Sequence, residues 1–121
     1  MMPKIMFIRA TRKNLESLAA WVQRSQSMAL DTAAIRQEVW FSGHVQGVGF
    51  RYQTRQVSME FDVSGTVQNL LDGRVHLVAE GEGKEVTAFI DEVSHQMSSY
   101  IKDVETSEVL DPSGLSGFSI I

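Results

Sequence analysis

The sequence contains no cysteine, and this absence removes several kinds of site at once. Disulfide bridges, thiolate metal ligands and a cysteine nucleophile are all excluded. Long apolar runs are also missing, since every apolar stretch falls far short of the roughly 20 residues that a membrane-spanning helix needs. These absences predict a cytoplasmic protein with no membrane partner.

Several familiar phosphate-site and metal-site motifs are missing as well. No Gly-Lys-Ser/Thr follows the glycine-rich stretch around Gly47, so this stretch is not a nucleotide-binding P-loop. It also lacks the glycine spacing and the long βαβ context of a dinucleotide-binding fingerprint. The three histidines, His44, His76 and His95, show no ligand spacing, so we expect no metal site.

The charge of the chain is small and unevenly distributed. The 121 residues carry a net charge of −4, with +4 on residues 1–30 and −8 on the remainder. An acidic body disfavours a nucleic-acid backbone as partner, and the aromatic pattern of RNA-binding RNP motifs is absent. Any phosphate-bearing ligand must therefore be held by a local site, because the overall field repels it.

Apolar periodicity predicts one α+β domain over residues 37–121. The predicted order is strand 39–45, helix 51–61, strand 63–70, strand 74–79, helix 85–98, strand 101–110 and strand 118–121. This β-α-β-β-α-β order predicts an antiparallel sheet with two helices on one face and a short C-terminal fifth strand. The second helix carries an apolar stripe of Val86, Phe89, Ile90, Val93 and Met97. Gly81 and Gly83 are expected to break the pattern after the third strand, with Glu80, Glu82 and Glu85 marking a solvated loop and an acidic helix start.

Residues 1–36 form a separate, partly helical N-terminal extension in this prediction. A short apolar run from Ile5 to Ile8 is followed by a helical pattern of Leu15, Leu18, Ala19 and Val22. Three interpretations stay open: a helix packed on or loosely attached to the domain, translated upstream sequence with Met28 as the natural start, and a transit peptide. Under the upstream-sequence and transit-peptide interpretations, the extension is not part of the mature domain.

The most informative stretch is a strand that leads into a glycine-rich loop and a helix. It reads Gly43-His44-Val45-Gln46-Gly47-Val48-Gly49-Phe50-Arg51, and Gly65-Thr66-Val67-Gln68-Asn69 follows on the next strand. Free backbone N–H groups in such a loop form a site for an anion. Arg51 adds a planar guanidinium that matches phosphate oxygens, and the carboxamide of Asn69 can hold a water.

Less specific roles compete with this interpretation. Arg51 could be an ordinary surface cation, although a positive charge at a helix N-terminus opposes the helix dipole and needs a reason. A bound dianion between the arginine and the helix end supplies that reason. Asn69 could instead cap the turn at Leu70–Gly73, where asparagine is common.

The same residues resemble the acylphosphatase family. The resemblance is carried by Gly43-x-Val45-Gln46-Gly47-Val48-x-Phe50-Arg51, Gly65-x-Val67-x-Asn69, Asp72-Gly73-x-Val75 and Phe118-x-Ile120. It implies a small ferredoxin-like domain that hydrolyses the carboxyl-phosphate anhydride of acyl phosphates. By this resemblance Arg51 and the amides of the loop from His44 to Arg51 bind the phosphoryl group, and Asn69 positions the attacking water. Neither a cofactor, a metal nor a covalent phosphoenzyme is implied.

Two other functions remain as alternatives at this stage. The same loop would serve a non-catalytic phosphate-binding module, and the fold would serve a protein- or RNA-binding domain. Asn69 favours the enzyme, since anion binding alone does not require it. We therefore expect a monomer that acts on a small-molecule acyl phosphate.

Overall fold

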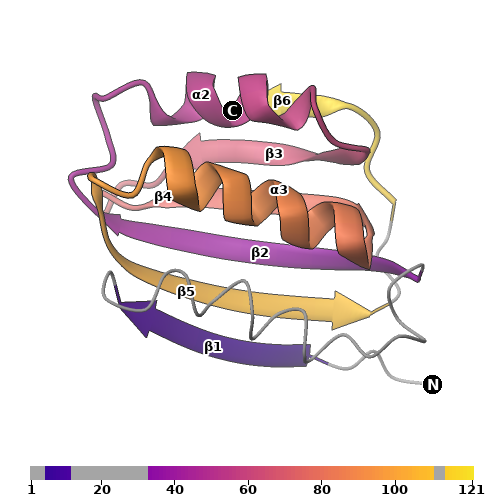
Figure 1. Cartoon of the computed structure of the whole chain (residues 1–121). Helices are drawn as coiled ribbons and strands as arrows, with labels where there is room; N and C mark the ends of the chain where they lie inside the picture. Colours follow the sequence, from indigo (N-terminus) through magenta and orange to yellow (C-terminus); the bar gives the residue numbers. More distant parts are fainter. Residues whose placement is uncertain (1–4, 12–32, 111–113) are drawn as a thin grey trace.

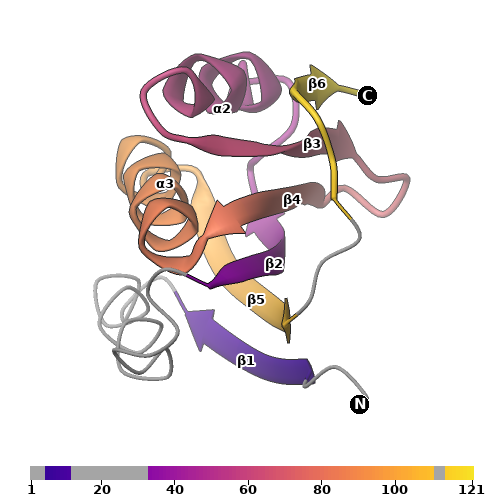
Figure 2. The ribbon, with the colours of Figure 1, turned by 90° about the vertical axis from the view of Figure 1, so that its right-hand side faces the viewer.

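The computed structural model describes residues 5–11, 33–110 and 114–121, which form six strands and two helices (Figure 1). These elements are β1 (Ile5–Thr11), β2 (Ala34–Gly43), α2 (Phe50–Ser58), β3 (Val63–Asn69), β4 (Val75–Glu82), α3 (Gly83–Gln96), β5 (Ile101–Leu110) and β6 (Phe118–Ile120). Both helices cover the same face of one twisted sheet (Figure 2). The predicted β-α-β-β-α-β core is therefore confirmed as β2-α2-β3-β4-α3-β5.

The sheet has the strand order β1-β5-β2-β4-β3-β6. Neighbouring strands from β1 to β3 pair antiparallel, as predicted for the core. β6 pairs parallel with β3, with Gly65 opposite Phe118 and Val67 opposite Ile120. The sheet is therefore mixed, and its C-terminal strand lies at the far edge from β1.

The core lies between the helices and the sheet. All five residues of the predicted α3 stripe are buried, and Phe89 is fully enclosed. From the sheet, Val39, Phe41, Val67 and Leu77 face them with no exposed surface. Truncating a buried phenylalanine such as Phe89 to alanine costs about 3–5 kcal/mol of stability, because a cavity adds to the lost transfer energy.

Several element ends differ from the predicted ones. α2 ends at Ser58 instead of Phe61, since the N–H groups of Met59, Glu60 and Phe61 donate to carbonyls three residues back and tighten the chain into turns. β4 runs through Gly81 to Glu82, because cross-strand partners hold both residues in the sheet. Only β5 has the predicted bounds at both ends.

Glycine is required at Gly65 by a close backbone approach. A Cβ built at this position would lie 1.8 Å from the carbonyl oxygen of Val78 in β4. No side chain fits there without displacing the neighbouring backbone. Gly65 belongs to the Gly65-x-Val67-x-Asn69 motif, and its structural role is to let β3 lie close against β4.

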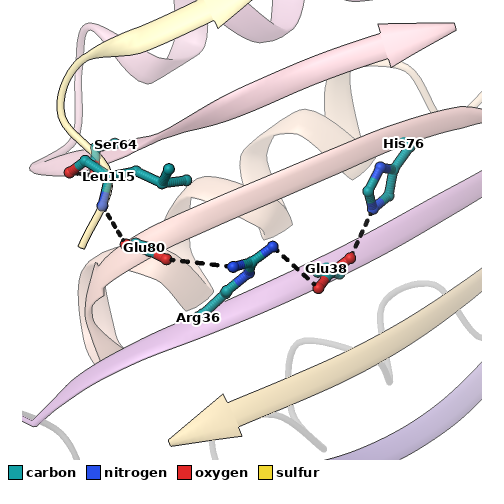
Figure 3. A network of polar contacts seen from close by, with 6 residues as sticks. All are labelled: Arg36, Glu38, Ser64, His76, Glu80 and Leu115. Atoms are coloured by element: carbon teal, nitrogen blue, oxygen red, sulfur yellow. Dashed lines mark hydrogen bonds and ion pairs between the residues drawn. The ribbon is translucent and has the colours of Figure 1, made fainter. Parts of the chain in front are cut away.

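The face of the sheet opposite α2 and α3 carries a connected row of polar side chains (Figure 3). The Nε2 atom of His76 lies 2.9 Å from Glu38 Oε1, and Arg36 lies 3.4 Å from the other oxygen of Glu38. Arg36 also approaches Glu80, which is only 3% exposed. The prediction that Glu80 lies in a solvated loop is wrong, because β4 continues past it and buries it.

The N-terminal segment contributes a strand that the sequence did not indicate. Residues Ile5–Thr11 pair antiparallel with β5 and extend the sheet. β2 begins at Ala34, so the predicted boundary between residues 36 and 37 falls inside a strand. The helical pattern from Leu15 to Val22 and the candidate start Met28 lie outside the described residues. Within the described residues, no helix is long and apolar enough to span a membrane.

Candidate active site

The loop between β2 and α2 depends on two glycines in the left-handed region. Gly47 has φ +79° and Gly49 has φ +80°, and Gly49 is the N-cap residue of α2. Residues with a side chain rarely adopt this conformation, so glycine is needed at both positions. A Cβ on either one would meet no atom within 4 Å, because both face open space. The backbone is therefore accessible on this side.

The start of α2 offers several free N–H donors. The first intrahelical hydrogen bond runs from Gln53 N–H to the carbonyl of Gly49, at 3.0 Å, so the three N–H groups before it have no helical acceptor. Within the described chain, the N–H groups from Gln46 to Gly49 donate to no main-chain oxygen either. The first turn of α2 holds no acidic residue. The positive helix end is thus left open to an anion.

A pocket of about 230 Å³ opens at this helix end. Its lining comes from the loop and α2, from the end of β3 and from β6: Val45, Gly47, Gly49, Phe50, Arg51, Tyr52, Asn69 and Ile120. Arg51 and Asn69, which the sequence placed in one site, line this same pocket. Among the described lining residues Arg51 is the only charged one.

Asn69 lines this pocket and carries an unpaired acceptor. Its Oδ1 atom is buried and has no hydrogen-bond partner among the residues that the structure describes. The turn that follows is closed without it: Gly73 N–H donates to the carbonyl of Leu70 at 3.1 Å, and Arg74 N–H donates to Asp72 Oδ1 at 3.1 Å. Asp72 supplies the side-chain acceptor of this turn, and the Arg74 N–H holds the pKa of Asp72 below its usual range.

Arg51 keeps most of its hydrogen-bonding capacity. Its Nη1 donates to the main-chain oxygen of Ile121 at 3.3 Å. No side-chain carboxylate of the described residues pairs with it. Ile121 is itself held, since its N–H donates to the carbonyl of Val67 at 2.9 Å. One end of the guanidinium is thereby fixed to the β3–β6 edge, which leaves further donors for a ligand.

The remaining residues of the predicted phosphate loop do not line the pocket. His44 is exposed, and its N–H donates to the carbonyl of Tyr100 at 2.9 Å. Val48 packs partly buried against the core. The side-chain amide of Gln46 donates to the carbonyls of Leu70, at 2.8 Å, and Arg74, at 3.0 Å. Gln46 therefore ties the loop to the turn that follows Asn69.

Two lining residues were not found by sequence reasoning. Tyr52 directly follows Arg51 in the predicted helix, and this adjacency could have indicated that Tyr52 lies beside the pocket. Ile120 reaches the pocket through the parallel pairing of β6 with β3. The sequence predicted a strand here and Ile120 belongs to the Phe118-x-Ile120 motif, but the partner strand was not predicted.

No metal-binding group is apparent in the part of the chain that the structure describes. None of its His, Asp and Glu side chains gather in a set of three or more able to hold an ion. His76 instead contacts Glu38 and stacks on Trp40, with ring centroids 4.9 Å apart.

Comparison with known proteins decides the family. Residues 37–120 match the acylphosphatase family model. The chain belongs to the acylphosphatase family. The acylphosphatase of Listeria welshimeri is 50% identical over 66 residues, which cover 54% of this chain and 67% of that protein. The acylphosphatase of Haloarcula marismortui is 42% identical over 90 residues, covering 73% and 97%.

The fold agrees with that of a solved acylphosphatase. The crystal structure of the enzyme from Bacillus subtilis matches with a TM-score of 0.67 and 31% identity, covering 72% of this chain and 98% of that one. The acylphosphatase match includes the whole loop, Asn69 and β6, and it begins after residue 36. The family match thus begins inside β2, three residues after the first residue of that strand.

Proposed function

We propose that this acylphosphatase holds the phosphoryl group of an acyl phosphate on Arg51 and the loop amides, while Asn69 positions the attacking water. The observation that carries the proposal is the shared pocket. Its lining includes Arg51, Asn69 with an unpaired carboxamide oxygen, and residues at the start of α2, where N–H groups have no helical acceptor. An anion cradle beside a water-binding group is what attack on phosphorus requires.

The reaction needs little chemical assistance from side chains. Water attacks phosphorus, the bond from phosphorus to the bridging oxygen breaks, and the acyl group leaves as a carboxylate with inorganic phosphate as the other product. A carboxylate is a good leaving group, so catalysis consists mostly of positioning and of stabilising charge on the equatorial oxygens. Neither a histidine nor a carboxylate is found among the described lining residues. The proton of water therefore passes to a phosphoryl oxygen of the substrate.

The test is hydrolysis of benzoyl phosphate in the presence of a chelator. Arg51→Ala should abolish both turnover and inhibition by inorganic phosphate while the protein stays folded. Arg51→Lys should not restore activity, because lysine lacks the planar fork, and loss of a transition-state donor costs about a hundredfold or more. Arg55→Ala, an exposed arginine one turn further along α2, is the matched control and should behave as wild type. Activity that requires an added divalent metal, or near-normal activity of Arg51→Lys, would contradict the proposal.

The partners follow from the same site. We infer that a small-molecule acyl phosphate is the substrate, that nucleic acid is not a partner, and that the chain works as a monomer in the cytoplasm. The acidic body and the small pocket support the first two inferences. The cysteine-free sequence fits a reducing compartment. Light scattering of the purified chain measures its oligomeric state directly.

A further inference from the structure

The turn between β3 and β4 contains a dipeptide that the proposed function does not use. Asp72-Gly73 is the only place in the sequence where a glycine follows an aspartate or an asparagine. The turn projects from the ends of the two strands (Figure 2), and the side chain of Asp72 is 53% exposed. Because glycine has no side chain to shield its own nitrogen, Asp-Gly is the sequence at which an aspartate rearranges most readily to isoaspartate.

This rearrangement needs no reagent except water. The main-chain nitrogen of Gly73 bonds to Cγ of Asp72, and a succinimide ring closes. One carboxyl oxygen leaves as water, which carries off the amide proton and the proton of the carboxylic acid. Water then adds to the ring carbonyl that was the main-chain carbonyl of Asp72, and the original peptide bond breaks. The main chain afterwards runs through the side-chain carboxyl group, which gives isoaspartate.

Both reacting groups are held in other hydrogen bonds in the structure. Asp72 Oδ1 accepts from the main-chain N–H of Arg74 at 3.1 Å, and Asp72 Oδ2 accepts from Arg74 Nε at 2.8 Å. The N–H of Gly73 donates to the carbonyl of Leu70 at 3.1 Å. The Arg74 N–H also holds the pKa of Asp72 below its usual range, and an ionised carboxylate gives up an oxygen less readily than a carboxylic acid.

The same turn is connected to the candidate active site. The carbonyls of Leu70 and Arg74 both accept from the side-chain amide of Gln46, at 2.8 Å and 3.0 Å. Isoaspartate adds one atom to the main chain between these carbonyls, so a single amide group would no longer hold both. Asn69, which lines the pocket, directly precedes Leu70. A rearranged turn would therefore shift Asn69 relative to the phosphate loop.

We propose that Asp72 is a site of spontaneous modification to isoaspartate, that the side chain of Arg74 slows this reaction, and that the modified enzyme is inactive. An exposed ion pair adds little to stability, so the rate of modification is the quantity in which the Asp72–Arg74 pair should be visible. The loss of activity rests on the proposed role of Asn69, whereas the modification itself does not.

The experiment incubates the full chain and samples it over time for two quantities. Isoaspartate at Asp72 is measured by enzymatic methylation of isoaspartyl residues with peptide mapping, and kcat is measured with benzoyl phosphate. Arg74→Met keeps a long side chain without the Nε donor, and it should accumulate isoaspartate severalfold faster than the wild type and lose kcat in parallel. Arg55→Met removes an exposed arginine of α2, and this matched control should behave as wild type.

A double variant separates modification from simple weakening of the turn. Arg74→Met combined with Asp72→Glu should keep its kcat during the incubation, because glutamate closes the corresponding larger ring much more slowly. The inference is overturned if Arg74→Met forms isoaspartate no faster than the wild type, or if isoaspartate at Asp72 leaves kcat unchanged. It is also overturned if the double variant loses kcat as fast as Arg74→Met. A freshly purified, folded wild type without activity would instead remove the proposed function.

Discussion

At the scale of single residues, the site is defined by which polar atoms are already used and which are not. Arg51 donates one hydrogen bond to the main-chain oxygen of Ile121. The buried Oδ1 of Asn69 accepts none from the described residues. Gln46 uses its amide on two carbonyls and has no part in the lining. The motif therefore contains residues that line the pocket, such as Arg51 and Asn69, and residues such as Gln46 that hold neighbouring segments together.

Replacing Asn69 by alanine separates its two candidate roles. If Asn69 positions water, Asn69→Ala should lower kcat strongly and leave inhibition by inorganic phosphate nearly unchanged, because the interaction is made only on the way to the transition state. Steady-state kinetics with benzoyl phosphate measures both quantities. A variant with full kcat and a lowered melting temperature would assign Asn69 to the turn.

Changing Gln46 to glutamate tests the tie between the loop and the turn. The new carboxylate cannot donate, and it would face the carbonyl oxygens of Leu70 and Arg74 that now accept from the amide. We expect a loss of about 1–3 kcal/mol in the free energy of unfolding, the usual cost of a buried polar group without a partner. Denaturant unfolding gives this value, and kcat should fall as the loop shifts relative to Asn69. Gln56→Glu on α2 is the control, and equal effects of the two variants would argue against a special role for Gln46.

At the scale of elements, β6 completes the pocket and is held by contacts on the face of the sheet opposite α2 and α3. Glu80 Oε1 accepts from Leu115 N–H at 2.6 Å, and Ser64 Oγ donates to the carbonyl of Leu115 at 2.9 Å (Figure 3). Two residues later, the carbonyl of Gly117 accepts from Gly65 N–H at 2.9 Å. These bonds set the entry into β6, whose Ile120 lines the pocket.

Removing the carboxylate of Glu80 should therefore act on the site from the opposite face. We expect Glu80→Ala to lower the free energy of unfolding by about 1–3 kcal/mol, since the Leu115 N–H loses its acceptor. Hydrogen exchange at Leu115 and Ile121 should accelerate. Glu82→Ala in the same strand removes an exposed carboxylate and should stay within about 0.5 kcal/mol of wild type. Unchanged exchange at Ile121 in Glu80→Ala would show that β6 does not depend on this anchor.

The elements also show how far the sequence could predict the fold. The α3 stripe and the bounds of β5 were predicted because their periodicity is a local property of the chain. The loop and Asn69 were singled out because the complete Gly43–Arg51 run and Gly65–Asn69 together resemble a family motif, and their part in catalysis stays a prediction. The pairing of β6 with β3 and the burial of Glu80 depend on contacts between distant segments, so local patterns did not reveal them. For the same reason Ile120 was missed as a pocket residue.

At the scale of the whole molecule, the pocket and the N-terminal strand lie at opposite edges of the sheet. β1 borders β5, whereas the pocket is formed at β3, β6 and α2. The acylphosphatase match also omits residues 1–36. We therefore expect the pocket to keep its geometry when the extension is removed. β5, in contrast, would lose β1, which pairs with it at the edge of the sheet.

A chain that begins at residue 33 tests this separation. It should keep the kcat and KM of the full chain for benzoyl phosphate. It should also self-associate as its concentration rises, because β5 then becomes an open edge strand with unpaired backbone groups. Light scattering over a concentration series measures the association. Loss of activity in a shortened chain that still unfolds cooperatively would show that the extension supports the site.

The stacking of Trp40 on His76 provides an intrinsic optical probe of this protein. The two rings lie on strands β2 and β4, and they separate when the sheet comes apart. Neither α2 nor α3 covers their face of the sheet, whereas the candidate pocket opens at the start of α2. Indole fluorescence, recorded in a Trp21→Phe background, should thus follow unfolding while staying silent to phosphate, so that ligand affinity and conformational stability can be read as separate signals from one unlabelled sample.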